Sequence, residues 1–323
     1  MDQYRLSERD ELSLDAAKFY YSGLSQAEVA KRLHLGRTTV SKLLTHARKR
    51  GFIQTVVKDP REDDKVLIEA LQHRYGLHEV ALVSPADTTT NGIRQALGVA
   101  GAQTLSSLVR DGDTIGMVYS RTVAALASNL ESQTRSNVSV VELSRGLTSP
   151  QDTVNYYPST LAHLASAFGG HYFQLGSPLF VASVQEKNQL LSQSYLREVL
   201  AMGDSCRIAV YTVGDLVSNR ELILKTPILP REREVINQRA VGDICSRFID
   251  SRGRICVPDL NNRTVGISLP SLRRKEQKVL IAGGTRKVEA VFAALENGYV
   301  NRLVTDYSTA AAIVKKFKPV PRG

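Results

Sequence analysis

The 323-residue sequence has no tryptophan and only three cysteines and three methionines. The cysteines Cys206, Cys245 and Cys256 are too few for a disulfide framework, and none stands at metal-ligand spacing from another, so we expect buried thiols and neither a bound metal nor a cofactor. No run of 18 apolar residues occurs, which excludes a transmembrane helix of ordinary length. The N-terminus is polar and lacks the apolar stretch of a signal peptide, so we expect a cytoplasmic protein.

Positive charge is concentrated at the N-terminus. The whole chain carries a formal net charge of +10. Residues 1–58 contain 11 Lys or Arg against 6 Asp or Glu, which gives +5 in less than a fifth of the chain. A short segment with this charge density favours a polyanion as its partner.

The segment LSQAEVAKRLHLGRTTVSKLL, residues 24–44, contains two short amphipathic patterns separated by a Leu-Gly break. Ser25 and Glu28 have the spacing of a capping box and predict the start of one helix. A second helix is predicted to start near Arg37. Together with an earlier helix over about residues 8–22, they form a helix-turn-helix pattern, in which the last helix enters the major groove of DNA.

The predicted recognition helix has one apolar face and one polar face. Its apolar residues follow the spacing i, i+3, i+4, i+7 and are Val40, Leu43, Leu44 and Ala47. The opposite face offers donors that suit base edges and phosphates, and we predict DNA contacts from Arg37, Thr38, Thr39, Ser41, Lys42, His46 and Lys49. The following sequence FIQTVVK predicts a short strand or wing. A generic three-helix bundle with a solvated basic face is the alternative.

After a charged break at residues 58–64, the chain alternates between β and α patterns. The boundaries predict a DNA-binding domain over 1–58 and a second domain over 62–323. Apolar strands are predicted at 79–83, 113–119, 138–143, 206–212, 278–284 and 301–306, and helices at 65–75, 92–109, 121–131, 159–168, 186–201, 286–297 and 307–317. This alternation predicts an α/β fold with a mostly parallel sheet covered on both faces. Residues 144–160 and 213–240 are poorly patterned and are interpreted as loops near a site.

Small ligands of such sheets bind beyond the carboxyl ends of the strands. At one predicted strand-to-helix junction, Ser120, Arg121 and Thr122 suit a phosphate, or simply cap a helix. At another, Gly283 and Gly284 precede Lys287 in a sequence that is not a P-loop.

The stretch AVGDICSRFID carries two further acidic residues, Asp243 and Asp250. A carboxylate there would bind sugar hydroxyls, or Asp243 would merely cap a helix. The residues leave this choice open.

Several stretches together resemble the SorC family of bacterial sugar-responsive transcription regulators. The resemblance covers nearly the whole chain and rests on GLSQAEVAKRLHLGRTTVSKLLTHARKRGFI, AVGDICSRFID, IAGGTRKVEAVFAAL and VNRLVTDYSTAAAIV. It implies an effector domain similar to sugar-phosphate isomerases of the NagB/RpiA type. It also implies a double-stranded DNA operator and a phosphorylated sugar effector as partners, and assembly into a homo-oligomer, dimer or tetramer.

The resemblance also assigns roles to single residues. Lys287 falls on the lysine of the family's AGG-x-x-K pattern, which implies a phosphate contact, and Asp243 falls on an acidic position that faces the sugar. Arg121 and Thr122 match a strand-end GRT element, in which Ser120 here replaces the glycine. Gly36 likewise replaces the serine that usually precedes the recognition helix.

Other functions remain as alternatives. The deoxyribonucleoside regulators of this family also resemble the chain, and some form a Schiff base from a lysine near the VVELSRG strand end. No lysine lies between Lys65 and Lys187, which excludes an imine there. An isomerase with an attached DNA-binding domain is the main alternative, although no clear acid/base constellation is present, and a recombinase would need a nuclease motif that the sequence does not show.

Overall fold

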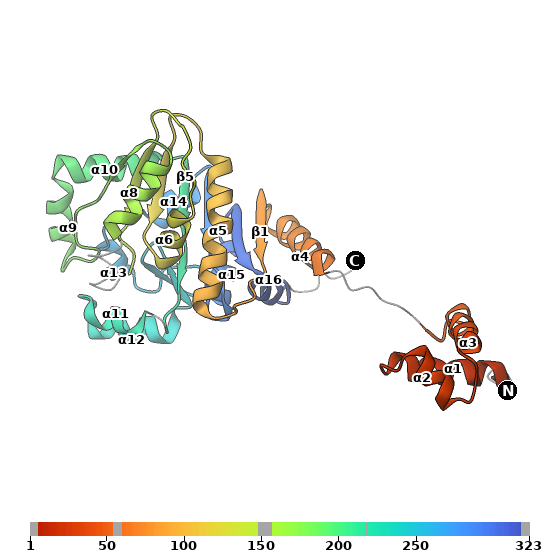
Figure 1. Ribbon diagram of the computed structural model, residues 1–323. Coiled ribbons are helices and arrows are strands. Elements are labelled where there is room, and N and C mark those ends of the chain that lie inside the picture. The colour runs from red at the N-terminus through yellow and green to blue at the C-terminus, as the bar shows by residue number, and fades with distance from the viewer. Residues whose placement is uncertain (1–5, 54–59, 148–156, 218, 318–323) are drawn as a thin grey trace. The chain divides into compact units, whose positions relative to one another are not determined.

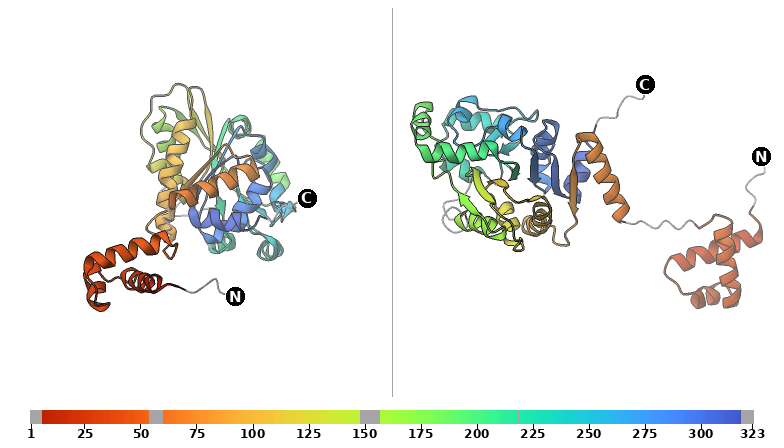
Figure 2. Two further views of the ribbon diagram at one scale, coloured as in Figure 1. Left: turned by 90° about the vertical axis from the view of Figure 1, so that its right-hand side faces the viewer. Right: turned by 90° about the horizontal axis from the view of Figure 1, so that it is seen from above.

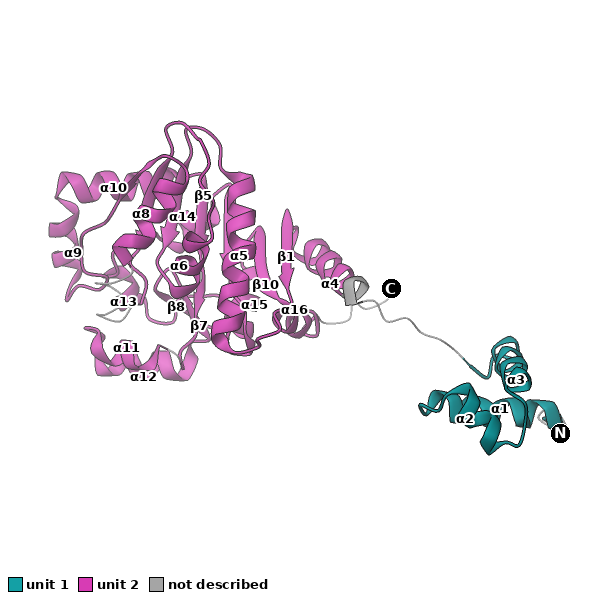
Figure 3. Cartoon of the chain, in the orientation of Figure 1, with its two compact units in different colours: residues 1–60 teal, residues 61–323 magenta. Residues whose placement is uncertain are grey.

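The computed structural model describes residues 6–53, 60–147, 157–217 and 219–317. The chain divides into two compact units, residues 1–60 and 61–323, which Figure 3 shows in teal and magenta. Each unit has its own hydrophobic core.

The first unit consists of α1 (Glu8–Tyr21), α2 (Gln26–Arg32) and α3 (Arg37–Lys49). Ser7 and Ser25 begin the first two helices with capping boxes, which satisfy backbone donors that have no partner within a helix. The core of the unit is built from Ala16, Ala17, Val29, Ala30, Val40, Leu43, Leu44 and Ala47. The predicted apolar face of the third helix is therefore confirmed.

The link between α2 and α3 is a tight turn. His34 has a φ of 55°, and Gly36 is the N-cap of α3 without a side-chain bond to the helix. The short link lets the two helices cross steeply, as in a helix-turn-helix. Most of the strand or wing predicted over residues 52–58 lies outside the described residues.

The second unit contains a seven-stranded parallel sheet in the order β1-β10-β9-β5-β2-β3-β4. Its strands are β1 (Glu79–Val83), β2 (Thr114–Val118), β3 (Ser139–Ser144), β4 (His171–Phe173), β5 (Ile208–Tyr211), β9 (Gln277–Ile281) and β10 (Arg302–Asp306). All six strands predicted for this sheet are present. The short edge strand β4 was not predicted, because three residues are too few to show a period of two.

Helices cover both faces of this sheet (Figures 1 and 2). On one face α5 (Thr90–Leu108), α6 (Arg121–Ser128) and α8 (Tyr157–Ala167) bury their apolar sides against the strands. The other face is covered by α4 (Pro60–Tyr75), α10 (Ser194–Ser205), α14 (Leu269–Arg273), α15 (Val288–Glu296) and α16 (Tyr307–Val314). Alternate residues of β5 face opposite sides, so the strand is apolar throughout.

Two predicted segments differ from the structure. The helix expected over 186–201 is two helices, α9 (Val184–Leu191) and α10, and α4 already begins at Pro60, inside the expected linker, where proline is favoured at the first helical position. The loops expected within 213–240 are also wrong for most of that range. It holds β6 (Val213–Gly214), α11 (Arg220–Lys225) and α12 (Pro230–Arg239).

Helices α11 and α12 pack in a small hydrophobic cluster of their own, whereas Val213 of β6 belongs to the main core of the unit. Strand β6 pairs antiparallel with β7 (Gly242–Ile244), which forms a hairpin with β8 (Arg247–Ile249). The short helix α13 (Pro258–Asn262) packs in the same cluster. Among the described residues of both units, no helix is long and apolar enough to span a bilayer.

Helices α5 and α6 approach closely at Gly98. A Cβ atom there would lie 2.8 Å from both the carbonyl carbon and the Cβ of Ala125. Backbone cannot move aside as a flexible side chain can, so only glycine fits. This contact fixes α6, whose N-terminal end borders the cavity described below.

We predict that Gly98→Ala lowers the free energy of unfolding by up to about 2 kcal/mol. Alanine gains about 1 kcal/mol in helix propensity, but the clash with the α6 backbone costs about 1–3 kcal/mol. Denaturant unfolding measures the difference. Val99→Ala, at an exposed position of the same helix, is the control and should change stability little; equal effects of both variants would contradict the close packing.

Candidate functional sites

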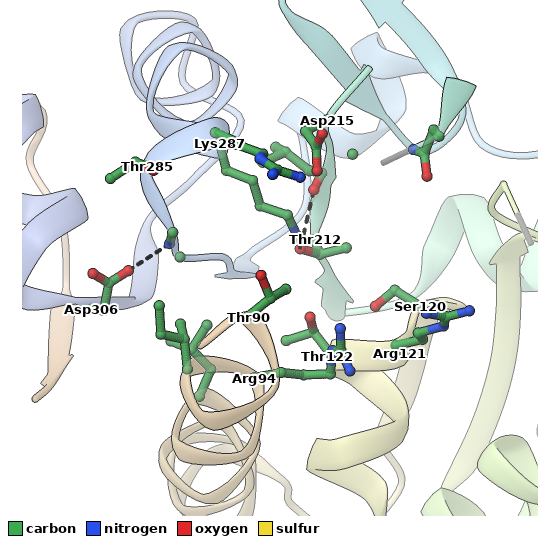
Figure 4. A pocket seen from close by; sticks show the side chains of 18 of the residues that line it. Thr90, Arg94, Ser120, Arg121, Thr122, Thr212, Asp215, Thr285, Lys287 and Asp306 are labelled. Carbon is green, nitrogen blue, oxygen red and sulfur yellow. Dashed lines mark hydrogen bonds between the residues drawn. The ribbon is translucent and has the colours of Figure 1, made fainter. Parts of the chain in front are cut away.

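A cavity of about 930 Å³ opens at the carboxyl ends of the parallel strands (Figure 4). Val83, Val118 and Asp306, the last residues of β1, β2 and β10, line it. The segments that follow β3, β5 and β9 complete its walls. The structure brings all seven predicted effector-site residues together here: Ser120, Arg121, Thr122, Asp243, Gly283, Gly284 and Lys287.

Lys287 extends into the cavity from the short 3-10 helix η1 (Thr285–Lys287), which precedes α15. Its Nζ donates to Thr212 Oγ1 at 3.2 Å. Burial of the ammonium lowers the pKa of Lys287 to about 8, although the nearby carboxylates of Asp215 and Asp243 oppose this shift. The lysine is therefore charged at neutral pH and weakly solvated, a state that favours an anionic partner.

Asp243 lies on β7, on the same wall as Lys287. Burial raises the pKa of Asp243 to about 6, while the backbone N–H of Ser246, donated at 3.1 Å, and the charge of Lys287 oppose the shift. Gly214 makes room for this carboxylate, because a Cβ there would lie 1.9 Å from Asp243 Oδ1. The Asp243 carboxylate therefore stabilises the turn of the β7–β8 hairpin and does not cap a helix. The helix-cap alternative for Asp243 is wrong.

The opposite wall comes from α5 and α6. Ser120 Oγ accepts the backbone N–H of Val123 at 3.0 Å and so caps α6, while the side chain of Thr122 is buried and Arg121 is exposed. Figure 4 shows Arg94 of α5 beside Thr122, on the side of the cavity that faces Lys287. The two arginines and the lysine give the cavity cations on both walls.

The two glycines after β9 serve two different purposes. A Cβ at Gly283 would lie 2.4 Å from Asp306 Oδ2, so this glycine is required by packing against the end of β10. Gly284 has a φ of 94°, which favours glycine, and its N–H donates to Asp306 Oδ2 at 2.7 Å and to Thr309 Oγ1 at 2.9 Å. Its N–H is therefore held within the protein.

Asp250, which the sequence offered as a second sugar-binding carboxylate, does not line the cavity. It accepts the backbone N–H groups of Arg252 and Arg254, both at 2.9 Å, and the Arg254 guanidinium at 2.9 Å. These bonds hold the turn after β8. The reading of Asp250 as a ligand residue is therefore wrong.

The first unit presents the polar face of α3 to solvent. Six of the seven predicted DNA-contact residues are exposed: Arg37, Thr38, Thr39, Ser41, Lys42 and Lys49. His46 is half-buried instead, and its Nε2 lies 2.8 Å from Oδ1 of Asp10 in α1. The side chain of His46 is therefore already engaged inside the unit.

Comparisons with known proteins place this arrangement in a family. Residues 59–315 match the family model described as "Putative sugar-binding domain". The chain is 35% identical over 309 residues to the deoxyribonucleoside regulator of Bacillus subtilis (strain 168), covering 95% of this chain and 98% of that one. The chain belongs to the SorC family of sugar-binding transcription regulators.

Two further comparisons concern the sorbitol operon regulator of Klebsiella pneumoniae. Its sequence is 27% identical over 302 residues, which are 93% of this chain and 96% of that protein. The crystal structure of the full-length regulator, SorC, matches with a TM-score of 0.71 at 24% identity, over 96% of this chain and 100% of that one. The SorC-like α/β fold expected from the sequence is confirmed.

Sequence reasoning missed several residues of the cavity, among them Arg94, Thr212, Asp215 and Asp306. Asp306 ends a predicted strand before a helix, and this position alone could have identified it. Thr212 lies between β5 and β6, and Asp215 directly follows β6, a two-residue strand that shows no sequence pattern. Arg94 sits within a helix and has no sequence signal, because its direction depends on how α5 packs.

The shifted pKa of Asp243 predicts a pH dependence of stability. Its folded pKa of about 6 lies above the reference of 3.8, so the folded state binds the proton more tightly than the unfolded state. The free energy of unfolding therefore falls as pH rises from about 4 to 6, by up to about 3 kcal/mol from this group. We predict that Asp243→Asn removes this decline.

Denaturant unfolding at a series of pH values from 4 to 7 measures the effect. The exposed Asp259 supplies the control, since Asp259→Asn should leave the wild-type slope in place. A slope that is the same in wild type and Asp243→Asn would show that the folded-state pKa of Asp243 is not raised.

Proposed function

We propose that the chain is a DNA-binding transcription regulator whose operator binding is controlled by a phosphorylated sugar in the cavity. The observation that carries the proposal is one cavity with cations and carboxylates at the carboxyl edge of a parallel sheet, in a chain with a separate helix-turn-helix unit. Family membership supports it, since the relatives are transcriptional regulators.

The chemistry of the cavity suits a sugar with an anionic group. Lys287 and Arg94 offer charged donors from opposite walls, and such donors bind phosphate oxygens strongly. Asp243, Asp215 and Thr212 offer acceptors for hydroxyl groups next to Lys287. We assign the phosphate to the cations and the sugar hydroxyls to the carboxylate wall.

On the DNA side, we propose that the exposed face of α3 enters the major groove. Arg37 and Lys42 suit base edges or phosphates, and Lys49 near the C-terminal end suits a phosphate. A DNA contact by His46 stays a prediction, and the bond to Asp10 would compete with it. A protein that acts on DNA in this way works in the cytoplasm of a bacterium, which is the location we propose.

The relatives that cover most of this chain are named as transcriptional regulators, and we therefore propose regulation and no catalysis. The isomerase alternative would require turnover of ribose or glucosamine phosphates by the purified protein. The recombinase alternative has no support from the relatives.

We predict that Lys287→Met weakens the response to sugar phosphate about tenfold to a hundredfold. A charge-assisted hydrogen bond contributes about 1.5–3 kcal/mol, and the methionine keeps much of the stem's volume. DNA affinity without effector should remain close to wild type, because an effector acts only through its differential affinity for the two states. The measurement is DNA binding at increasing concentrations of a panel of sugar phosphates.

Lys225→Met is the control, since Lys225 is an exposed lysine of α11 that does not line the cavity. It should respond like wild type. If Lys287→Met also responds at wild-type concentrations, the phosphate lies elsewhere, and Ser120–Thr122 becomes the next position to test. If Lys287→Met loses DNA binding without effector, the lysine has a structural role.

We also propose that the chain acts as a homo-oligomer. A single helix-turn-helix covers only one half-site of an operator, so two-fold assembly is expected, with half-sites spaced by whole helical turns. The larger unit offers far more surface for this than residues 1–58 do.

A fragment of residues 62–323 is predicted to self-associate, since it holds the whole parallel sheet and its helices. Sedimentation equilibrium of the fragment and the full chain at equal concentrations tests this. A strictly monomeric fragment beside an oligomeric full chain would contradict the assignment of assembly to the larger unit.

A further inference from the structure

A buried carboxylate contacts the C-terminal end of α3, the proposed recognition helix. Asp10, in the first turn of α1, is 5% exposed. Its Oδ1 lies 2.8 Å from His46 Nε2 and accepts from Arg50 Nε at 3.0 Å, while its Oδ2 accepts from Arg50 Nη2 at 3.3 Å. These bonds connect α1 to the C-terminal end of α3. His46 and Arg50 lie 36 and 40 residues after Asp10 in the sequence.

The geometry holds the Arg50 guanidinium against the unit. The guanidinium carbon also lies 5.6 Å from the centre of the Phe52 ring. The contact with His46, followed by that with Ser7, keeps the pKa of Asp10 well below its usual range. The carboxylate therefore stays charged at every pH at which DNA binding is measured, and its two oxygens remain available to Arg50 and to the His46 ring.

Neighbouring cations are arranged differently. Arg9, Lys42 and Lys49 border a surface groove together with His46. Among the described residues, the side chains of Lys42 and Lys49 have no hydrogen-bond or ion-pair partner. Lys49 and Arg50 are thus adjacent in sequence, both exposed and both cationic, but only Arg50 is held by a carboxylate.

We propose that Asp10 is a positioning and specificity residue for DNA binding: it anchors the recognition helix through His46 and Arg50 and withholds the Arg50 charge from the DNA backbone. The inference rests on the proposed DNA binding and assigns different roles to the cationic side chains of α3 and its C-cap. Lys42 and Lys49 contact phosphates, whereas Arg50 sets the position of α3.

This division favours sequence discrimination. Every free cation that reaches a phosphate strengthens binding to all sequences alike, because phosphates carry no sequence information. A cation neutralised by Asp10 adds little to non-specific binding. The anchored helix, by contrast, keeps its side chains at fixed positions relative to base edges, which strengthens binding to the matching sequence only.

The first experiment compares Lys49→Met with Arg50→Met in the full-length protein. The probe is a random-sequence DNA duplex, and the affinity is measured at several salt concentrations without sugar. Each lost phosphate contact reduces the slope of log affinity against log salt by about 0.9. We expect this reduction for Lys49→Met and less than half of it for Arg50→Met.

The second experiment compares Asp10→Asn with Asp15→Asn. Both variants remove one negative charge from α1. Asp15 is exposed, and its Oδ1 lies 3.7 Å from Nζ of Lys18 in the same helix, so it does not connect α1 to α3. A second probe is the duplex that the wild type selects from a random pool. Asp10→Asn frees Arg50 and should raise affinity for random DNA several-fold, while affinity for the selected duplex falls. Asp15→Asn should leave the ratio of the two affinities unchanged.

The outcomes separate the possible roles. A purely structural Asp10 would lower both affinities together, and a purely electrostatic one would raise both together. If Arg50→Met reduces the slope of log affinity against log salt as much as Lys49→Met does, the inference is overturned. This comparison decides the question even if Asp10→Asn does not fold. Wild-type protein that selects no duplex overturns the proposed function instead.

Discussion

Parallel strand pairing is the constraint on which the larger unit depends. Because the sheet is parallel, every strand delivers its carboxyl end to the same edge, and residues far apart in sequence meet there. Val83 pairs with Asp306 in register across β1 and β10, although more than 200 residues separate them. The cavity lies at this edge, and most of its walls are the segments that leave the strands.

Two kinds of electrostatic arrangement occupy this edge. Asp306 is fully used inside the protein, where the Gly284 N–H and the Thr309 N–H and hydroxyl all donate to it. Lys287 and Asp243 have fewer hydrogen-bond partners. Burial lowers the pKa of Lys287 and raises the pKa of Asp243, so it disfavours the charged form of each. A ligand that offers an anionic group to Lys287 and hydroxyl groups to Asp243 would offset the cost of burying these two charges. Such a ligand would lie next to the ends of β5 and β9 and beside β7. The site is thereby suited to link binding to the arrangement of these junctions.

Sequence reasoning located the parts of the fold that have strong local signals. The recognition helix, the capping box at Ser25 and the apolar strands follow from periodicity and spacing. The predicted effector-site residues line one cavity because most of them follow strand ends, whereas Asp243 lies within β7. The hairpin of β7 and β8 was missed, since three-residue strands show no pattern, and Arg94 and Asp10 were missed because their roles depend on partners brought close only by folding.

The central claim is that the cavity and the DNA-binding unit share one conformational equilibrium. Thermodynamic linkage makes this claim measurable, because two coupled ligands must change each other's affinity by the same factor. The most direct test is titration of the responding sugar phosphate into the free protein and into the protein saturated with its selected duplex. The account predicts that the ratio of these two sugar affinities equals the ratio of the DNA affinities measured with and without the sugar. Equal sugar affinities for free and DNA-bound protein would contradict it.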